Sequence, residues 1–251
     1  MTIQGKLDGA EGLEGTPADG SPVPGELHRP LRLVLLGAPG VGKGTQGELL
    51  RERLGISHLS TGDLFRAAGS RNAGIRTPAM EAALHYMRRG ELVPDATVWD
   101  LVRDKSDSLR SREGFLLDGF PRTLAQAEML KTFMDYEKLP LSAVVNYEMP
   151  QSEIVMRLSG WRICAKCKSV FHVTWRPAKT EGVCDECGGR LYRRDDDNPD
   201  SIAIRLDTYQ RSTALLIEFY KDLGVLLPVD ADGSPEEVFA RTMGALKMRV
   251  G

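Results

Sequence analysis

Residues 31–45 read LRLVLLGAPGVGKGT, and this stretch decides the fold. Its first six residues form an almost continuous apolar run, which is typical of a strand buried on both faces of a parallel sheet. From Gly37 to Lys43 the chain matches the G-x-x-x-x-G-K pattern of a phosphate-binding loop, with Thr45 close behind. Glycines let successive backbone N–H groups face an anion, which also meets the N-terminus of the next helix. A Gly-rich turn without a ligand is the alternative, but the order of strand, loop and helix favours a nucleoside triphosphate site.

Strand and helix patterns alternate along the rest of the chain, which favours a parallel α/β sheet. Further strands are predicted at residues 56–59, 115–117, 143–147 and 225–229. Helices are predicted at residues 45–54, 63–69, 78–89, 96–109, 124–139, 151–158, 201–223 and 235–248. A segment at about 160–195 breaks this rhythm, and we interpret it as a small inserted lobe.

The composition of the 251 residues limits the classes of function. There are 33 Lys and Arg residues against 35 Asp and Glu, a formal net charge of −2, which argues against a protein that coats nucleic acid or an anionic membrane. We find no run of 18 apolar residues and no apolar secretory core near the start, so a cytoplasmic location is expected. Residues 1–30 are rich in Gly, Pro and acidic residues, and we expect a disordered tail or, equally, a cloning or start-site artefact.

All four cysteines lie in two C-x-x-C pairs, Cys164 with Cys167 and Cys184 with Cys187, and sixteen residues separate the pairs. This spacing is typical of a structural zinc ion held by four thiolates, with no position left for water. A redox C-x-x-C pair is the alternative, which the presence of two spaced pairs disfavours. A nucleic-acid-binding zinc ribbon is a further alternative, which the neutral charge and the 6% aromatic content disfavour.

Three more segments indicate what receives the phosphoryl group. They read HLSTGDLFR at 58–66, GELVPD at 90–95 and GFLLDGFPRTLAQ at 114–126. Together with GAPGVGKGT, they resemble adenylate kinases, the nucleoside monophosphate kinases that convert ATP and AMP to two ADP. The resemblance implies a P-loop NTPase-type five-stranded parallel sheet with flanking helices. It places an AMP-binding helical insert at 60–93, a zinc lid at 160–197 and the core of a 31–251 kinase domain at 31–59, 94–159 and 198–251.

The resemblance also implies a role for each matched position. Catalysis would rest on Lys43, Arg122, Arg194, Arg205 and Asp118, the last holding magnesium-bound water. ATP would contact Gly40, Val41, Gly42, Lys43, Gly44, Thr45, Arg157, Val170 and Phe171. AMP would contact Thr61, Arg66, Glu91, Leu92, Val93, Gly119, Phe120, Pro121, Arg122, Gln126, Arg194 and Arg205, with Gln126 reading adenine. Two positions have structural alternatives: Asp63 as a helix N-cap and His58 as a packed or hydrogen-bonded core residue.

One position departs from the family pattern, which reads Arg-x-x-Gly-Arg where the lid begins. Residues 157–162 are RLSGWR, so Trp161 stands where an arginine for the ATP phosphates is usual. Arg162 is adjacent, but neighbouring side chains of an extended segment point to opposite faces. We therefore expect an active adenylate kinase that is slowed at the chemical step. A kinase for another nucleoside monophosphate and a weakly active or non-catalytic nucleotide-binding protein are the alternatives. Expected ligands are ATP, AMP, ADP, Mg²⁺ and structural Zn²⁺, with no nucleic acid or membrane partner, and the expected state is a monomer.

Overall fold

The computed structural model describes residues 30–68, 78–105, 114–174, 176–193 and 199–250. Five strands form one sheet in the order β2-β3-β1-β4-β8, and every neighbouring pair is parallel. The strands are β1 (Leu31–Gly37), β2 (Ser57–Ser60), β3 (Gly114–Asp118), β4 (Ala143–Glu148) and β8 (Leu226–Asp230). The predicted five-stranded parallel sheet is confirmed. The predicted tail, apart from Pro30, lies outside the described residues.

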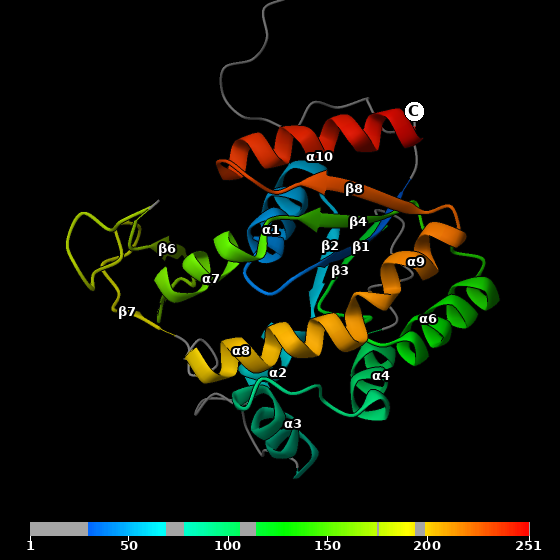
Figure 1. Ribbon diagram of the computed structural model, residues 1–251, viewed down its shortest axis with the longest axis horizontal. Coiled ribbons are helices and arrows are strands. Elements are labelled where there is room, and N and C mark those ends of the chain that lie inside the picture. The colour runs from blue at the N-terminus through cyan, green and yellow to red at the C-terminus, as the bar shows by residue number, and fades with distance from the viewer. Residues whose placement is uncertain (1–29, 69–77, 106–113, 175, 194–198, 251) are drawn as a thin grey trace, which may run out of the picture.

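Helices cover both faces of the sheet (Figure 1). One face packs against α1 (Lys43–Leu54) and α10 (Pro235–Val250), and the other against α4 (Asp95–Asp104), α6 (Leu124–Glu137) and α9 (Leu215–Asp222). Leu33 and Leu35 of β1 belong to the first core, whereas Val34 and Leu36 belong to the second. Because successive side chains of a strand point to opposite faces, burial on both faces requires the continuous apolar run seen in the sequence.

The remaining elements surround the carboxyl edge of the sheet. They are α2 (Thr61–Ala68), α3 (Pro78–Arg88), α7 (Gln151–Gly160) and α8 (Pro199–Thr208). Beyond α7 a small lobe contains a three-stranded antiparallel sheet, β6-β5-β7, formed by β5 (Trp161–Cys164), β6 (Val170–His172) and β7 (Leu191–Tyr192). This lobe lies at the left of Figure 1. Two to four residues are too few to show a period, so these strands were not predicted.

The helix predicted at 201–223 is interrupted. A π-helical turn, η2 (Tyr209–Thr213), separates α8 from α9, and the N–H of Ala214 donates to the carbonyl of Tyr209 at 2.8 Å. The single continuous helix was therefore a wrong prediction, because a π turn inserts one residue without breaking the apolar pattern on either side. The part of the chain that the structure describes holds no helix long and apolar enough to cross a membrane.

Candidate functional site

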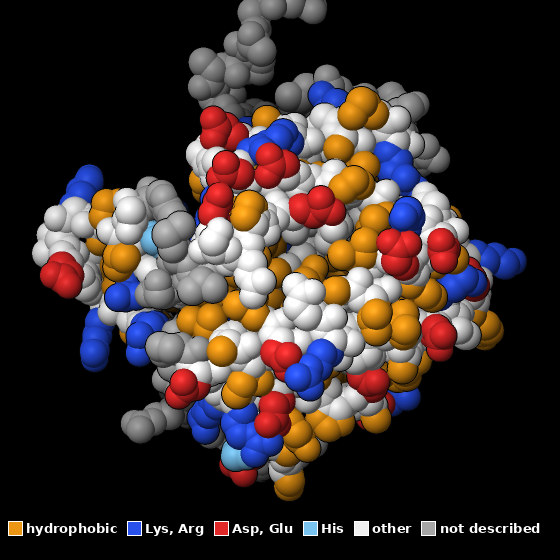
Figure 2. All heavy atoms as spheres, in the orientation of Figure 1, with side chains coloured by type: hydrophobic (Ala, Val, Ile, Leu, Met, Phe, Trp, Pro, Cys, Tyr) orange, Lys and Arg blue, Asp and Glu red, His pale blue; other side chains and the backbone are white. Residues whose placement is uncertain are grey.

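A cleft lies at the carboxyl edge of the sheet, which is where ligands bind in open α/β folds. Figure 2 shows the lobe standing out from the main body, with Lys and Arg side chains on its surface. Of the predicted ligand-binding positions, these line the cleft: Gly40, Gly42, Lys43, Gly44, Thr45, Arg66, Glu91, Leu92, Asp118, Gly119, Pro121, Arg122, Val170 and Arg205. The sheet and its insertions thus bring together residues from six separate stretches of sequence.

The phosphate-binding loop connects β1 to α1 and has the conformation that its glycines permit. Gly40 has a φ of 86° and Gly42 of 104°, and a Cβ on Gly40 would lie 2.5 Å from the Leu158 side chain. The Lys43 ammonium donates to the carbonyls of Gly37 at 2.7 Å and Ala38 at 3.0 Å. The Lys43 side chain therefore folds back and binds the backbone of the loop that contains it.

Charges from three elements meet at Lys43. Burial lowers the pKa of Lys43 to about 8; the carboxylate of Asp118 opposes the shift, while the guanidinium groups of Arg122 and Arg205 add to it. Asp118 ends β3 directly beside Leu35 of β1, so the sheet register places it next to the loop. Its Oδ2 lies 4.0 Å from the position of a Cβ on Gly44.

Two of the residues that line the cleft carry oxygen ligands of the kind that Mg²⁺ prefers, the Thr45 hydroxyl and the Asp118 carboxylate. Both follow from the local fold, because Thr45 is in the first turn of α1 and Asp118 is the last residue of β3. The donor set therefore fits a magnesium ion that enters with a triphosphate.

Arginines also line the cleft, among them Arg66, Arg122 and Arg205. The Arg66 guanidinium, 30% exposed, forms an ion pair with Asp63 at 2.7 Å. The Nε of Arg122 donates to the Gly119 carbonyl at 2.9 Å, and the Thr61 hydroxyl donates to the same carbonyl at 3.0 Å. Asp63 is not the N-cap of α2, because the helix begins two residues earlier, at Thr61.

Gln126, the predicted reader of adenine, is 1% exposed and does not line the cleft. Its Oε1 accepts the backbone N–H of Arg122 at 2.8 Å, and its Nε2 donates to Asp95 at 2.7 Å. In this conformation the amide holds protein groups at the start of α6.

Several other predicted ligand contacts are also buried. These residues are at most 8% exposed and are not among the described residues that line the cleft: Val41, Thr61, Val93, Phe120 and Phe171. Arg194 lies outside the described residues. The side chain of His58 is 5% exposed and lies 3.3 Å from Glu48, which confirms the prediction of a packed core residue.

Several cleft residues were not anticipated, among them Leu158, Ile163, Tyr209 and Thr213. Leu158 and Ile163 are apolar residues close to Trp161 in the sequence. Their position next to a predicted cleft residue is a signal that could have identified them. Tyr209 and Thr213 lie in η2, whose π geometry leaves no sequence signal.

The lobe contributes Trp161, which lines the cleft together with Ile163 and Val170. Arg162 is not among the cleft-lining residues that the structure describes, as expected from the alternation of side chains along β5. The Trp161 ring packs edge-on against His172, with 5.2 Å between ring centroids. The lobe therefore presents an apolar wall to the cleft at this position.

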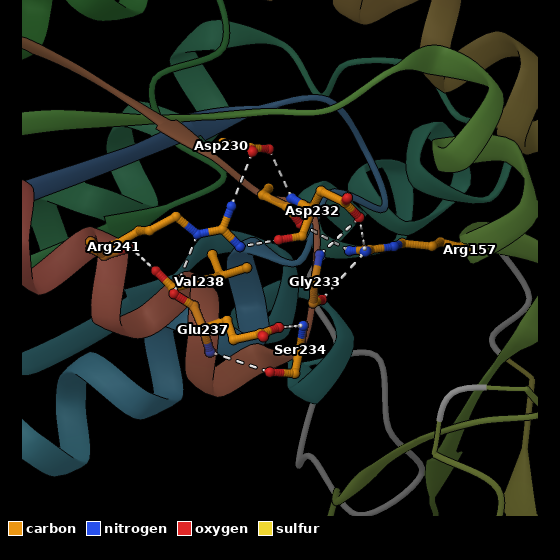
Figure 3. Close-up of polar contacts among 10 residues, drawn as sticks. Arg157, Asp230, Asp232, Gly233, Ser234, Glu237, Val238 and Arg241 are labelled. Carbon is orange, nitrogen blue, oxygen red and sulfur yellow. Dashed lines mark hydrogen bonds and ion pairs between the residues drawn. The ribbon is translucent and has the colours of Figure 1, made fainter.

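Arg157, predicted to lie near the ATP base, points toward the loop after β8 (Figure 3). Its guanidinium donates to the carbonyls of Ala231 at 3.3 Å and Gly233 at 3.5 Å. This loop is itself fixed, because Ser234 caps α10: the N–H of Ser234 donates to Glu237, and the N–H of Glu237 donates back to Ser234.

The four cysteines gather in the lobe with their sulfur atoms within 4.8 Å of one another. The Sγ atoms of Cys164 and Cys187 are 3.4 Å apart, and those of Cys167 and Cys184 are 3.5 Å apart. Tetrahedral coordination with bonds of about 2.3 Å separates thiolates by about 3.8 Å, so the cage fits one zinc-sized ion. A hydrogen bond with Ser169 lowers the pKa of Cys167 to about 6, which favours the thiolate that binds metal.

Comparisons with known proteins agree with this geometry. The adenylate kinase family model matches residues 35–225. The adenylate kinase of Carboxydothermus hydrogenoformans is 44% identical over 217 residues, covering 86% of this chain and 100% of that protein. Those of Streptomyces coelicolor (45% over 218 residues) and Caldicellulosiruptor saccharolyticus (46% over 217 residues) also cover 86% of this chain, and 99% and 98% of their own lengths. With its phosphate-binding loop, its cluster of cations and its four-cysteine lobe, the chain belongs to the adenylate kinase family.

Proposed function

We propose that this protein is an adenylate kinase, which transfers the γ-phosphoryl group of Mg²⁺-bound ATP reversibly to AMP and forms two ADP. The observation that carries this proposal is the convergence on one cleft of Lys43, Arg66 and Arg205 from three helices and of Arg122 from the loop after β3. Phosphoryl transfer depends mainly on positioning and on stabilising charge that spreads over the phosphate oxygens. A cleft lined by several fixed cations supplies both.

Each cation has a distinct task in this proposal. When ATP binds, the Lys43 ammonium replaces its hydrogen bonds to the loop carbonyls by hydrogen bonds to the β- and γ-phosphates. Thr45 and Asp118 hold the magnesium ion or its water. Arg66 and Arg122 hold the AMP phosphate through bidentate guanidinium contacts.

Arg205, together with Arg194, contacts the phosphoryl group that moves. The insert at 60–93 closes over AMP and the lid at 160–197 closes over ATP, which excludes water that would otherwise hydrolyse ATP. A structural zinc ion in the four-cysteine cage would stabilise the lid and take no part in the reaction.

Phosphoryl transfer from ATP to AMP, CMP, UMP and GMP, measured with Mg²⁺ present, tests the proposal against its alternatives. We expect ADP formation with AMP at a kcat/KM far above that of the other monophosphates. A preference for CMP, UMP or GMP would assign another monophosphate kinase. ATP binding without any transfer would assign a non-catalytic nucleotide-binding protein.

Binding of ATP should take up a proton at alkaline pH. In the free protein the pKa of Lys43 is about 8, and the negative phosphates raise it in the complex. At pH 6 the lysine is charged in both states, whereas at pH 8.5 most of the free protein carries a neutral lysine that is protonated on binding. ATP affinity should therefore fall as the pH rises through 8.

Calorimetry at pH 8.5 in buffers of different ionisation enthalpy measures this uptake, which we expect to be most of one proton. Lys43→Arg is the matched control, since its guanidinium is charged at every pH used and should show no uptake. An observed binding enthalpy of the unmodified protein that is the same in all buffers would contradict the prediction.

The four-cysteine cage should hold one zinc ion per chain. Among the described residues of the lobe, the buried hydrophobic cluster contains only Cys164, Phe171, Cys184 and Leu191. So small a core contributes little stability without the metal, so removal of zinc by a chelator should lower the Tm. ATP binding at the phosphate-binding loop should survive, since that loop belongs to another part of the fold. Metal analysis and a melting curve before and after zinc is added back measure this. Absence of zinc, or disulfides in the mass spectrum of the reduced protein, would contradict it.

Replacing the apolar wall at Trp161 by a cation should speed the chemical step. Trp161→Arg adds a charge near the transferred phosphates, and we expect kcat to rise by up to about tenfold, because other cations already share this task. The KM for AMP should change little. Trp161→Leu, which removes the ring without adding charge, should not raise kcat. If Trp161→Arg is no faster while Arg162→Ala is crippled, Arg162 already supplies the charge.

A further inference from the structure

Arg122 is held by its backbone as well as by its side chain. Its N–H donates to Oε1 of Gln126 at 2.8 Å, and its carbonyl accepts the hydroxyl of Thr213 at 2.9 Å. Both partners are buried, Gln126 at 1% and Thr213 at 8% exposure. The two polar groups of one peptide residue are thus fixed by side chains from two different helical segments.

The Gln126 contact has a defined orientation. An ionised carboxylate only accepts hydrogen bonds, so the Asp95 carboxylate, 2.7 Å from the side-chain nitrogen, requires the NH₂ end of the amide to face it. The Oε1 end must then face the N–H of Arg122. The hydroxyl of Thr123 donates to the second oxygen of Asp95 at 3.1 Å and fixes that carboxylate.

The Thr213 contact depends on the π turn. In η2 the N–H of Ala214 reaches back five residues to Tyr209, so the turn contains one residue more than an α-helical turn. One residue corresponds to a rotation of about 100° around a helix axis. With a continuous α-helix from Arg205 onward, Thr213 would therefore be rotated away from Arg122.

We propose that Thr213 is a positioning residue for phosphoryl transfer. Its hydroxyl fixes the carbonyl of Arg122 from the side opposite Gln126, and this holds the arginine in the cleft before substrates arrive. The guanidinium is also anchored, because its Nε donates to the Gly119 carbonyl at 2.9 Å. Arg205 lies in α8, the element that η2 follows directly in the chain, and it lines the same cleft as Arg122. The proposal rests on the proposed function, in which Arg122 holds the AMP phosphate.

The test compares Thr213→Val with Thr213→Ser. Valine keeps the shape and removes the hydroxyl, whereas serine keeps the hydroxyl. A small displacement of a catalytic group costs a large factor in rate, so we expect kcat/KM for AMP to fall about tenfold in Thr213→Val and to recover in Thr213→Ser. The KM for ATP should be unchanged.

Thr242→Val is the matched control. Thr242 is fully buried in α10 and is not among the described residues that line the cleft; its hydroxyl donates to the Val238 carbonyl at 2.8 Å and lies 3.2 Å from the Tyr147 hydroxyl. Both valine variants lose one buried hydroxyl and should show comparable losses in Tm. Only Thr213→Val should lower kcat/KM for AMP. Equal losses of kcat/KM in the two valine variants would overturn the proposal.

A second measurement separates positioning from a general structural effect. In an Arg122→Ala background, Thr213→Val should cause no further loss of kcat/KM, because the group that it positions is gone. Additive losses would overturn the proposal.

AMP affinity, measured by calorimetry without ATP, distinguishes this proposal from the proposed function. Thr213→Val should weaken AMP binding and Thr242→Val should not, even if the unmodified protein transfers no phosphoryl group. Unchanged AMP affinity in Thr213→Val, in a protein that binds AMP, would overturn the proposal; an unmodified protein without AMP affinity would overturn it together with the proposed function.

Discussion

The structure depends on holding several positive charges in one cleft before any phosphate is bound. Arg122 and Arg205 both act to lower the pKa of the buried Lys43, whereas the Asp118 carboxylate favours the charged form of this lysine. Such a cluster would disperse if its members were on flexible segments. The parallel sheet prevents this, because β1 and β3 deliver the loop and Asp118 side by side in fixed register.

The protein fixes this cluster largely through its backbone. Lys43 is tied to loop carbonyls, Thr61 and the Arg122 side chain share the Gly119 carbonyl, and the peptide groups of Arg122 are held on both sides. The hydrogen bonds to the peptide groups of Arg122 restrict where its side chain starts without using its guanidinium. A cation whose position is fixed in this way needs less reorganisation at the reaction step.

The sequence predicted those features whose physical cause is local. The run at 31–36 predicted a strand buried on both faces, the glycines predicted the phosphate-binding loop, and the C-x-x-C pairs predicted a cage that the sulfur atoms form. Features that depend on distant partners were not predictable. Both Gln126, which binds Asp95, and Thr213 in the π turn of the 201–223 segment, which binds the Arg122 carbonyl, contact partners far away in sequence. The resemblance to adenylate kinases supplied residue types at matched positions, but not the contacts of Gln126 or Arg157 in this conformation.

Trp161 changes the physical character of the lid side of the cleft. With Leu158, Ile163 and Val170 it forms an apolar surface, and its edge packs on His172, whose pKa is lowered by burial and by the neighbouring Arg157 and Arg162. His172 therefore stays neutral at physiological pH and adds no charge behind the ring. An apolar wall excludes water, and charges interact more strongly where water is excluded. A cation at the same place would stabilise the negative charge of the transferred phosphoryl group. It would also add to the repulsion among the positive charges of Lys43, Arg122 and Arg205. At this position the lobe thus places an apolar ring, and not a cation, in the wall of the cleft.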